Sequence, residues 1–233
     1  MKLPSVTRVD WPEARRFIRV ATASVNLFDD IARPEDWTLL ASAERKTDAR
    51  LSESVGNIEL ISEAHRVEDE TGVLMGPFTH VSYDLPSRFS TGRYGVLYAA
   101  NSLEAALMQT IHHHERFLRA TGEAAGWVSS CQEIVLSVSA DLHDIRDPEF
   151  SAWLHSENYA GAQGVAEPLH ASGSHGIVYP STRWPGGECV ALFYPDLAAN
   201  PVHGRIYDLH WNGKAVDYVR EHETDVVLKI HRS

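Results

Sequence analysis

A chain of 233 residues, of which 43% are hydrophobic and 23% charged, can bury one substantial core, and its length permits one domain or two. Its 32 acidic residues outnumber 21 Lys and Arg, and the formal net charge of -11 disfavours long-range attraction to DNA or RNA, so we expect no direct nucleic-acid partner. No stretch approaches the ~18 consecutive apolar residues of a membrane span, and the N-terminus lacks the apolar segment of a signal peptide, so we expect a cytoplasmic protein with no membrane partner.

Residues 1–75 are predicted to form a mostly helical and irregular extension. Pro34, Glu35 and Asp36 suit the first turn of a helix, because proline fits there and acidic side chains interact favourably with the helix dipole. Apolar side chains at helical spacing follow, and Gly56 is typical of a helix end. A helix over residues 34–56 is therefore expected.

Short strands are predicted from residue 76 onward. Residues 77–83, 87–90 and 95–100 are β-rich segments close to turn-forming residues. Ser102 is a good helix N-cap, and the helix that follows it is predicted to end at Gly122.

The next segments mix strands and helices. Residues 132–139 alternate apolar and polar side chains, which predicts a half-buried strand. Residues 158–173 are predicted to be a helix broken near Pro168. Residues 176–181 and 188–193 are predicted strands on either side of a turn rich in glycine and proline.

The C-terminal segment carries a strong hairpin signal. Asn212-Gly213 lies between two strand-like runs in residues 205–219, and residues 225–231 are predicted as the last strand. Because helices and strands do not alternate strictly, we expect an α+β fold with a mixed, largely antiparallel sheet and flanking helices. We expect one domain over residues 1–233, made of an extension (1–75), a core (76–195) and C-terminal strands (196–233).

Two strand-end segments near residue 90 combine polar and aromatic groups. Arg88, with Phe89 beside it, could hold a phosphate or ribose through its planar fork of donors, although a surface salt bridge is the alternative. Tyr98 could offer a ring face and a hydroxyl to a ligand, or be an ordinary half-buried strand tyrosine. Gln109 lies on the following helix and draws attention only through these neighbours.

A third segment contains Ser181 and Arg183. A serine at a strand end beside a glycine turn can contact a ligand closely, and capping the turn is its alternative role. Among the remaining residues, His112, His113 and His114 are adjacent on a helix, so they point about 100° apart and cannot converge on one metal ion. We therefore expect no metal site.

The two cysteines, Cys131 and Cys189, are far apart and show no CxxC spacing, which excludes a zinc ribbon and a redox motif. They are predicted to be reduced, partly buried thiols. No GxGxxG or GxxxxGK[ST] loop follows a predicted strand, so neither common nucleotide-binding loop is present. No GxSxG elbow supports a hydrolase triad.

Taken together, these segments resemble a known family. The run SRFSTGRYGVLYAANSLEAALMQTIHHHERF, followed later by GIVYPSTRWPGGECVALF, is similar to the RES-domain family, which is named for an Arg, a Glu and a Ser. Its members are toxins of RES–Xre toxin–antitoxin pairs. The resemblance covers roughly residues 76–195, and the combined pattern is specific where each piece alone is weak.

The resemblance implies a fold similar to ADP-ribosyltransferase toxins such as diphtheria toxin. It also implies that NAD+ is a consumed substrate rather than a resident cofactor, that an Xre-type antitoxin is the partner, and that a protein is a second candidate target. By motif, the family Arg, Tyr and Ser fall on Arg88, Tyr98 and Ser181. His80 and Arg183 lie next to these segments, and we expect them, with Phe89, to contact the substrate.

The family Glu falls on Gln109, which is a departure from the pattern. Cleavage of the nicotinamide–ribose bond builds positive charge on the ribose, and a glutamate would stabilise that charge and polarise the nucleophile. Glutamine keeps the size but carries no charge, so this chain is expected to be an inactivated form unless Glu104, Glu115 or Glu188 replaces the missing carboxylate.

Three hypotheses follow. The first is a toxin that cleaves NAD+, either degrading it or transferring ADP-ribose to a protein. The second is a catalytically dead module that binds NAD+ or a partner protein, and Gln109 supports it. The third is a metal-dependent hydrolase built on the histidines.

Overall fold

The structure is a computed structural model that describes residues 3–20, 56–68, 72–84, 86–222 and 224–230. Its strands form one sheet of eight in the order β1-β2-β5-β4-β3-β6-β7-β8. The strands are β1 Val6–Arg19, β2 Leu97–Ala100, β3 Gly126–Asp144, β4 Gly176–Pro180, β5 Glu188–Leu192, β6 Ala198–Trp211, β7 Val216–Glu221 and β8 Val227–Lys229. The helices are α3 Gly76–Thr79, α4 Leu103–Thr121 and α5 Ala160–Ala171.

The sheet closes on itself through β1. This strand pairs along most of its length with β3, from Val6 opposite His143 to Arg19 opposite Cys131, and it also meets β2 where Arg15 lies opposite Ala100. Because β2, β5, β4 and β3 pair in succession, these five strands form a closed circuit. Among the strands that the structure describes, only β3 and β4 pair in parallel, so the prediction of a mixed, largely antiparallel sheet with flanking helices is confirmed.

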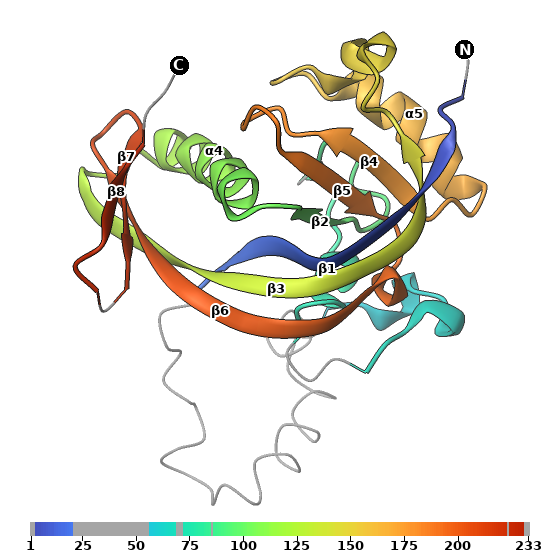
Figure 1. Ribbon diagram of the computed structural model, residues 1–233, viewed down its shortest axis with the longest axis horizontal. Helices are drawn as coiled ribbons and strands as arrows, with labels where there is room; N and C mark the ends of the chain where they lie inside the picture. Colours follow the sequence, from blue (N-terminus) through green and yellow to red (C-terminus); the bar gives the residue numbers. More distant parts are fainter. Residues whose placement is uncertain (1–2, 21–55, 69–71, 85, 223, 231–233) are drawn as a thin grey trace, which may run out of the picture.

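Two helices cover different parts of this sheet. Figure 1 shows α4 lying in the concave side of the long curved strands β3 and β6, while α5 lies beside β4. The side chain of Ser102 accepts a hydrogen bond from the backbone N–H of Ala105 at the start of α4, and Gly122 ends the helix in the left-handed conformation. The predicted bounds of this helix are therefore confirmed. None of the helices among the described residues combines the length and apolar character needed to span a membrane.

The mostly helical extension is wrong for residues 6–19, which form β1. The strand carries four arginines and a proline, and only Val9 and Ala14 are buried, so it lacks the alternating apolar pattern of a half-buried strand. Its register with β3 shifts between Trp11 and Ala14, where Pro12 has no N–H to donate. The predicted helix over residues 34–56 lies outside the described residues except at its last position.

Three smaller predictions are also wrong. Residues 77–83 begin inside the short helix α3, because Pro77 suits a first helical turn. Residues 87–90 form a tight turn closed by one bridge between Ser87 and Ser90 rather than a strand. Helix α5 is not broken at Pro168 and continues to Ala171. The proline removes a single intrahelical hydrogen bond, the one to the carbonyl of Gly164 in the preceding turn.

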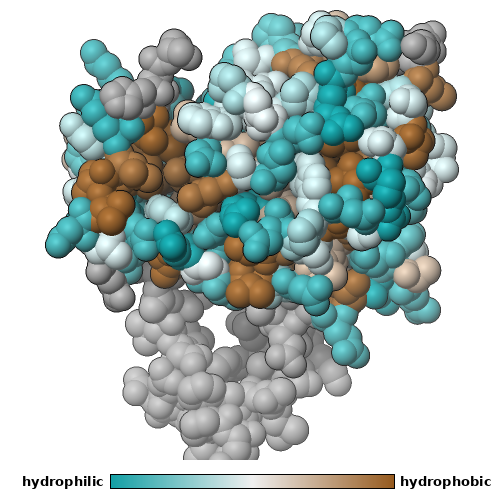
Figure 2. Space-filling view, in the orientation of Figure 1, coloured by the Kyte–Doolittle hydropathy of each residue, from teal (hydrophilic) through white to brown (hydrophobic). Residues whose placement is uncertain are grey.

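The C-terminal predictions are confirmed. β6 and β7 form a hairpin around Asn212 and Gly213, with the N–H of Asn212 bonded to the carbonyl of Ala215, and β8 follows as the last strand. Val227 and Leu228 of β8 are about half exposed, and Figure 2 shows apolar surface on the side of the molecule that carries β7 and β8.

Candidate active site

A cavity of about 210 Å³ lies where the circuit of strands meets the N-terminal half of α4. Residues of β1, β2, β4, β5 and α4 line it, together with the turn at residues 87–88 and Tyr159. Three predicted site residues from separate segments, Arg88, Tyr98 and Gln109, therefore share one cavity. The fold places them together because β2 leads directly into α4 and the turn at residues 87–90 precedes β2.

Arg88 is a buried positive charge with neutral partners. Its side chain is 6% exposed; Nη1 donates to the carbonyl of His155 at 2.8 Å and Nη2 donates to Oγ1 of Thr182 at 3.1 Å. The guanidinium also lies 4.6 Å from the centroid of the Tyr159 ring. Among the described residues no carboxylate is within ion-pair distance of Arg88. Burial of an uncompensated charge is costly, so the site favours an anionic ligand.

Tyr98 holds the turn that carries Arg88. Its hydroxyl accepts a hydrogen bond from the backbone N–H of Phe89 at 2.9 Å and lies 2.8 Å from Oγ of Ser87. Phe89 is buried and packs against Tyr98 and Tyr179, so it supports the cavity from behind and does not line it. The hydroxyl that we expected to face a sugar is thus occupied by the protein, while the ring of Tyr98 still lines the cavity.

The cavity has a positive character in an acidic protein. Arg15, Arg16 and Arg88 line it, and none of its lining residues is a carboxylate. Burial raises the pKa of Tyr98 to about 12 and that of the Cys189 thiol to about 11, so both groups are neutral at pH 7. Burial also lowers the pKa of His113, which favours its neutral form. Among the lining residues the charge therefore comes from the guanidinium groups, and that of Arg15 is partly compensated by Glu13 and Glu133.

Gln109 lies one turn before His113 on α4, and both line the cavity. Its amide nitrogen is buried beside the Cys189 thiol and has no nitrogen or oxygen acceptor among the described residues. A thiol is only a weak acceptor, so this buried donor is poorly satisfied, which is uncommon in proteins. It is available to a ligand that brings an acceptor, such as a sugar hydroxyl or a carboxamide oxygen.

The three alternative carboxylates do not replace Gln109. Glu115 is buried, pairs with Arg119 at 2.9 Å and accepts a hydrogen bond from the backbone N–H of Val216, so it has a structural role. Glu188 pairs with Arg146 at 2.9 Å. Neither of these residues, nor Glu104, lines the cavity.

Ser181 and Arg183 lie beside the cavity rather than in its lining. Oγ of Ser181 accepts hydrogen bonds from the N–H groups of Arg183 and Trp184, which is the turn-capping role, and the same hydroxyl contacts the Cys189 thiol. His80 does not line the cavity either; its ring nitrogen Nδ1 lies 3.1 Å from Oγ1 of Thr79.

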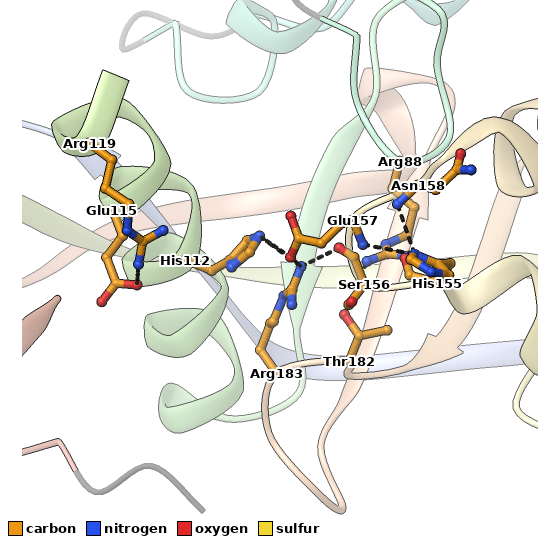
Figure 3. A network of polar contacts seen from close by, with 10 residues as sticks. All are labelled: Arg88, His112, Glu115, Arg119, His155, Ser156, Glu157, Asn158, Thr182 and Arg183. Carbon is orange, nitrogen blue, oxygen red and sulfur yellow. Dashed lines mark hydrogen bonds and ion pairs between the residues drawn. The ribbon is translucent and has the colours of Figure 1, made fainter. Parts of the chain in front are cut away.

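Arg183 fastens a segment that we name the strap, residues 155–159 between the 3-10 helix η4 (Pro148–Leu154) and α5. Figure 3 shows Arg183 pointing toward His112 of α4 and toward Ser156 and Glu157 of the strap. Nη2 of Arg183 lies 2.7 Å from Nε2 of His112, donates to the carbonyl of Ser156 and lies 3.5 Å from Glu157. Arg88 holds the carbonyl of His155, the first residue of the strap, and Tyr159, its last residue, lines the cavity, so the strap borders the cavity.

Four further lining residues could hardly be predicted from the sequence: Tyr159, Tyr179, Cys189 and His113. Tyr159 belongs to the exposed strap, and Tyr179 and Cys189 lie in apolar strands that read as ordinary core. The diverging directions of the three adjacent histidines were the available signal for His113. In the structure His112 contacts Arg183, His113 lines the cavity, and His114 contacts Oγ of Ser129.

Within the described ranges, no three His, Cys, Asp or Glu side chains cluster closely enough to hold a metal ion. Cys131 and Cys189 are both free and buried.

The family model of the RES domain matches residues 63–212, which is more than half of the chain. One solved structure with a similar chain is the crystal structure of the M. tuberculosis MbcT–MbcA toxin–antitoxin complex; the alignment covers 89% of this chain and 86% of that chain, with 10% sequence identity and a TM-score of 0.40. A search of curated protein sequences returned no match.

Proposed function

This chain belongs to the RES-domain family, and from that premise we propose that it binds NAD+ in the cavity and acts on the nicotinamide–ribose bond as the toxin of a bacterial toxin–antitoxin pair. The observation that carries the proposal is Arg88, a buried guanidinium without a carboxylate partner among the described residues, in a cavity walled by tyrosine rings. A dinucleotide supplies the anion and the planar rings that such a cavity favours.

The proposed reaction follows from the groups that line the cavity. The bond between C1′ of the ribose and the ring nitrogen breaks, its electron pair remains on nicotinamide, and a nucleophile adds at C1′. Arg88 anchors the phosphate next to the nicotinamide ribose, and Tyr98 and Tyr159 offer ring faces to nicotinamide. The nucleophile is either water or phosphate, which degrades NAD+, or a group on a protein, which becomes ADP-ribosylated.

Gln109 limits the rate of this step. It can hydrogen-bond the ribose, but it cannot carry the negative charge that would stabilise an oxocarbenium ion, and no carboxylate lines the cavity in its place. Loss of one such contribution typically costs about 10²–10⁴ in rate. We therefore propose that the chain retains NAD+ binding and turns NAD+ over slowly.

A second candidate function is a catalytically dead module that binds NAD+ or a partner protein. The lack of any carboxylate in the cavity lining favours it. In either case, an Xre-type antitoxin that covers the cavity is the proposed partner, by membership of the family.

The test is an assay of NAD+ binding and turnover on this chain and on its Gln109→Glu variant. We expect both forms to bind NAD+ and the variant to consume it about 10² times faster or more. Gln132→Glu, which adds the same charge on β3 outside the cavity, is the matched control and is expected to leave turnover unchanged. An equal rate in the first two forms would contradict a catalytic role for position 109.

Isotope labelling separates the two outcomes of the reaction. NAD+ labelled in its adenosine moiety yields labelled free ADP-ribose, or its phosphate ester, if NAD+ is degraded. It yields labelled protein if ADP-ribose is transferred. Binding of NAD+ without either product, in both forms, would favour the catalytically dead module.

A further inference from the structure

The cavity is too small for a whole dinucleotide. Its volume of about 210 Å³ lies below the range of about 300–1,000 Å³ that is usual for sites that enclose a drug-sized ligand. If the proposed function holds and the nicotinamide end enters the cavity, the adenosine end must lie outside it. A dinucleotide site therefore needs a second subsite that is continuous with the first.

A groove of about 330 Å³ adjoins the cavity. Phe17 of β1 and Thr110 and His113 of α4 line both spaces, so the two are separated only by side chains that they share. No other described pocket shares a residue with the cavity.

Planar groups line the groove. Phe117 of α4 is 46% exposed, although aromatic side chains of its size are usually largely buried. The guanidinium of Arg19 lies 5.1 Å from the centroid of its ring, and the ring of His114 lies 6.2 Å from it with an angle of 21° between the planes. Any nucleic-acid base can stack on aromatic rings and guanidinium planes of this kind, because every base has a flat π face.

Positively charged side chains extend from the cavity to the groove. On β1, Arg15 and Arg16 line the cavity and Arg19 lines the groove, in a chain whose formal net charge is -11. Part of the charge of Arg15 is compensated by Glu13 and Glu133. A diphosphate that crosses from one space to the other would remain close to guanidinium groups along its path.

We propose that this groove binds the adenine base of the dinucleotide, while the β1 arginines accompany the diphosphate between the two spaces. The inference rests on the proposed function and adds to it the orientation of the substrate. The competing occupant is the group that attacks the ribose, and the experiment distinguishes it.

The experiment compares two ligands, NAD+ and nicotinamide mononucleotide, which lacks the adenosine end. Phe117→Ala removes the exposed ring, and we expect the Kd for NAD+ to rise about ten-fold while the Kd for nicotinamide mononucleotide is unchanged. Arg19→Gln is a second variant that leaves Phe117 in place, and it is expected to weaken NAD+ selectively as well. Tyr83→Ala removes an aromatic side chain that is 73% exposed outside the groove, and it should change neither Kd.

Three other outcomes would contradict either the adenine site or the proposed function. If Phe117→Ala leaves both Kd values unchanged but lowers turnover, the groove holds the attacking group and the adenine site is wrong. If both Kd values rise together, Phe117 supports the cavity structurally and the adenine site is again wrong. If the binding signal of NAD+ with the unaltered chain does not exceed that of a buffer blank, the proposed function itself fails.

Discussion

Arg88 shows how one residue can be costly for the fold and useful for a ligand. Its charge is buried, and the carbonyl of His155 and the hydroxyl of Thr182 are neutral acceptors that compensate it only in part. An anionic ligand completes the set of partners. Stability and binding therefore respond differently when the charge is removed.

The Arg88→Met substitution tests this separation. Removal of a desolvated charge stabilises the fold, whereas the loss of a donor for two neutral acceptors destabilises it. Because the two effects oppose each other, we expect the free energy of unfolding to change by no more than about 1 kcal/mol. We expect the affinity for NAD+ to fall about 100-fold, since the phosphate loses its buried partner. Denaturant titration and NAD+ titration measure the two effects. Unchanged NAD+ affinity would show that Arg88 is not the anchor.

Gly92 determines the shape of the turn that carries Arg88. Its φ of +87° is in the left-handed region, and a Cβ there would lie 2.3 Å from the carbonyl oxygen of Ser82. We expect Gly92→Ala to destabilise the protein by about 2 kcal/mol or more and to weaken NAD+ binding, because the backbone must shift.

Gly122→Ala is the matched control for this substitution. Gly122 has a φ of +66° at the end of α4, but nothing lies within 4 Å of its added Cβ. It should cost about 1 kcal/mol and leave NAD+ binding intact, as thermal unfolding and ligand titration would show. Similar losses of NAD+ binding in both variants would contradict the steric argument.

At this scale the sequence predicted part of the site. The family pattern and residue chemistry selected Arg88, Tyr98 and Gln109, which share the cavity. Ser181 and Arg183 lie beside it, and Tyr159 was missed. Arg88, Tyr98 and Gln109 lie on a turn, a strand and a helix that follow one another in the chain, so their proximity could be predicted from the sequence order. Tyr159 reaches the cavity only because the strap is fastened there by contacts between residues far apart in the sequence.

Most residues of the strap are exposed, and a few contacts with Arg88 and Arg183 hold it in place. Nη2 of Arg183 can donate to Nε2 of His112 only while that nitrogen is unprotonated. Burial, followed by the charge of Arg183, lowers the pKa of His112 to about 4, so this histidine is neutral at pH 7. In an unfolded chain the same imidazole would titrate near pH 6.5.

The pH dependence of stability follows from this difference. Between pH 6.5 and about 4 the unfolded chain binds a proton that the folded chain does not, so the contribution of His112 is present above pH 6.5 and is lost as the pH falls. His112→Gln keeps an acceptor for Arg183 and removes the titration. We expect the unaltered chain to lose up to about 3 kcal/mol more stability than this variant over that range.

Denaturant titration at pH 7, 6, 5 and 4 measures the effect. His203→Gln replaces an exposed imidazole on β6 and is expected to follow the unaltered chain. Parallel curves for the unaltered chain and His112→Gln would show that the contact does not depend on the protonation of His112.

Elements with strong local signals were predicted well, and those that depend on distant partners were not. α4 has a cap at each end, and the hairpin of β6 and β7 has Asn-Gly at its turn. β1 has neither a turn signal nor an alternating apolar pattern, and its long pairing with the distant strand β3 makes it a strand. Apolar periodicity in a sequence reflects which side chains are buried. Because only two residues of β1 are buried, this strand could not be predicted from its periodicity.

In the molecule as a whole, β1 closes the circuit of five strands by pairing with β2 and with β3. β1 contributes to the central core and carries part of the cavity lining, whereas β8 is an edge strand with exposed residues. The mixed sheet was predictable from the order of strand-like segments. The closure was not, because it depends on a single residue pair between β1 and β2 and on the one parallel pairing of β3 with β4.

Two truncations test the unequal weight of these strands. Removal of residues 1–19 should prevent cooperative folding, since β3 loses its longest partner and the core loses Val9 and Ala14. Removal of residues 226–233 should lower the melting temperature by only a few degrees, because the three residues of β8 are exposed. Circular dichroism during heating measures both. A cooperative transition after loss of β1 would show that the circuit is dispensable.

The circuit also dictates when the cavity can come into being during synthesis. Each residue of β1 finds its β3 partner more than 100 positions further along, and the Cys189 wall arrives on β5 later still. A fold dominated by such distant pairings forms slowly, and domains form as units once their parts are available. A nascent chain on the ribosome would therefore carry no complete cavity until the residues up to β5 have been translated.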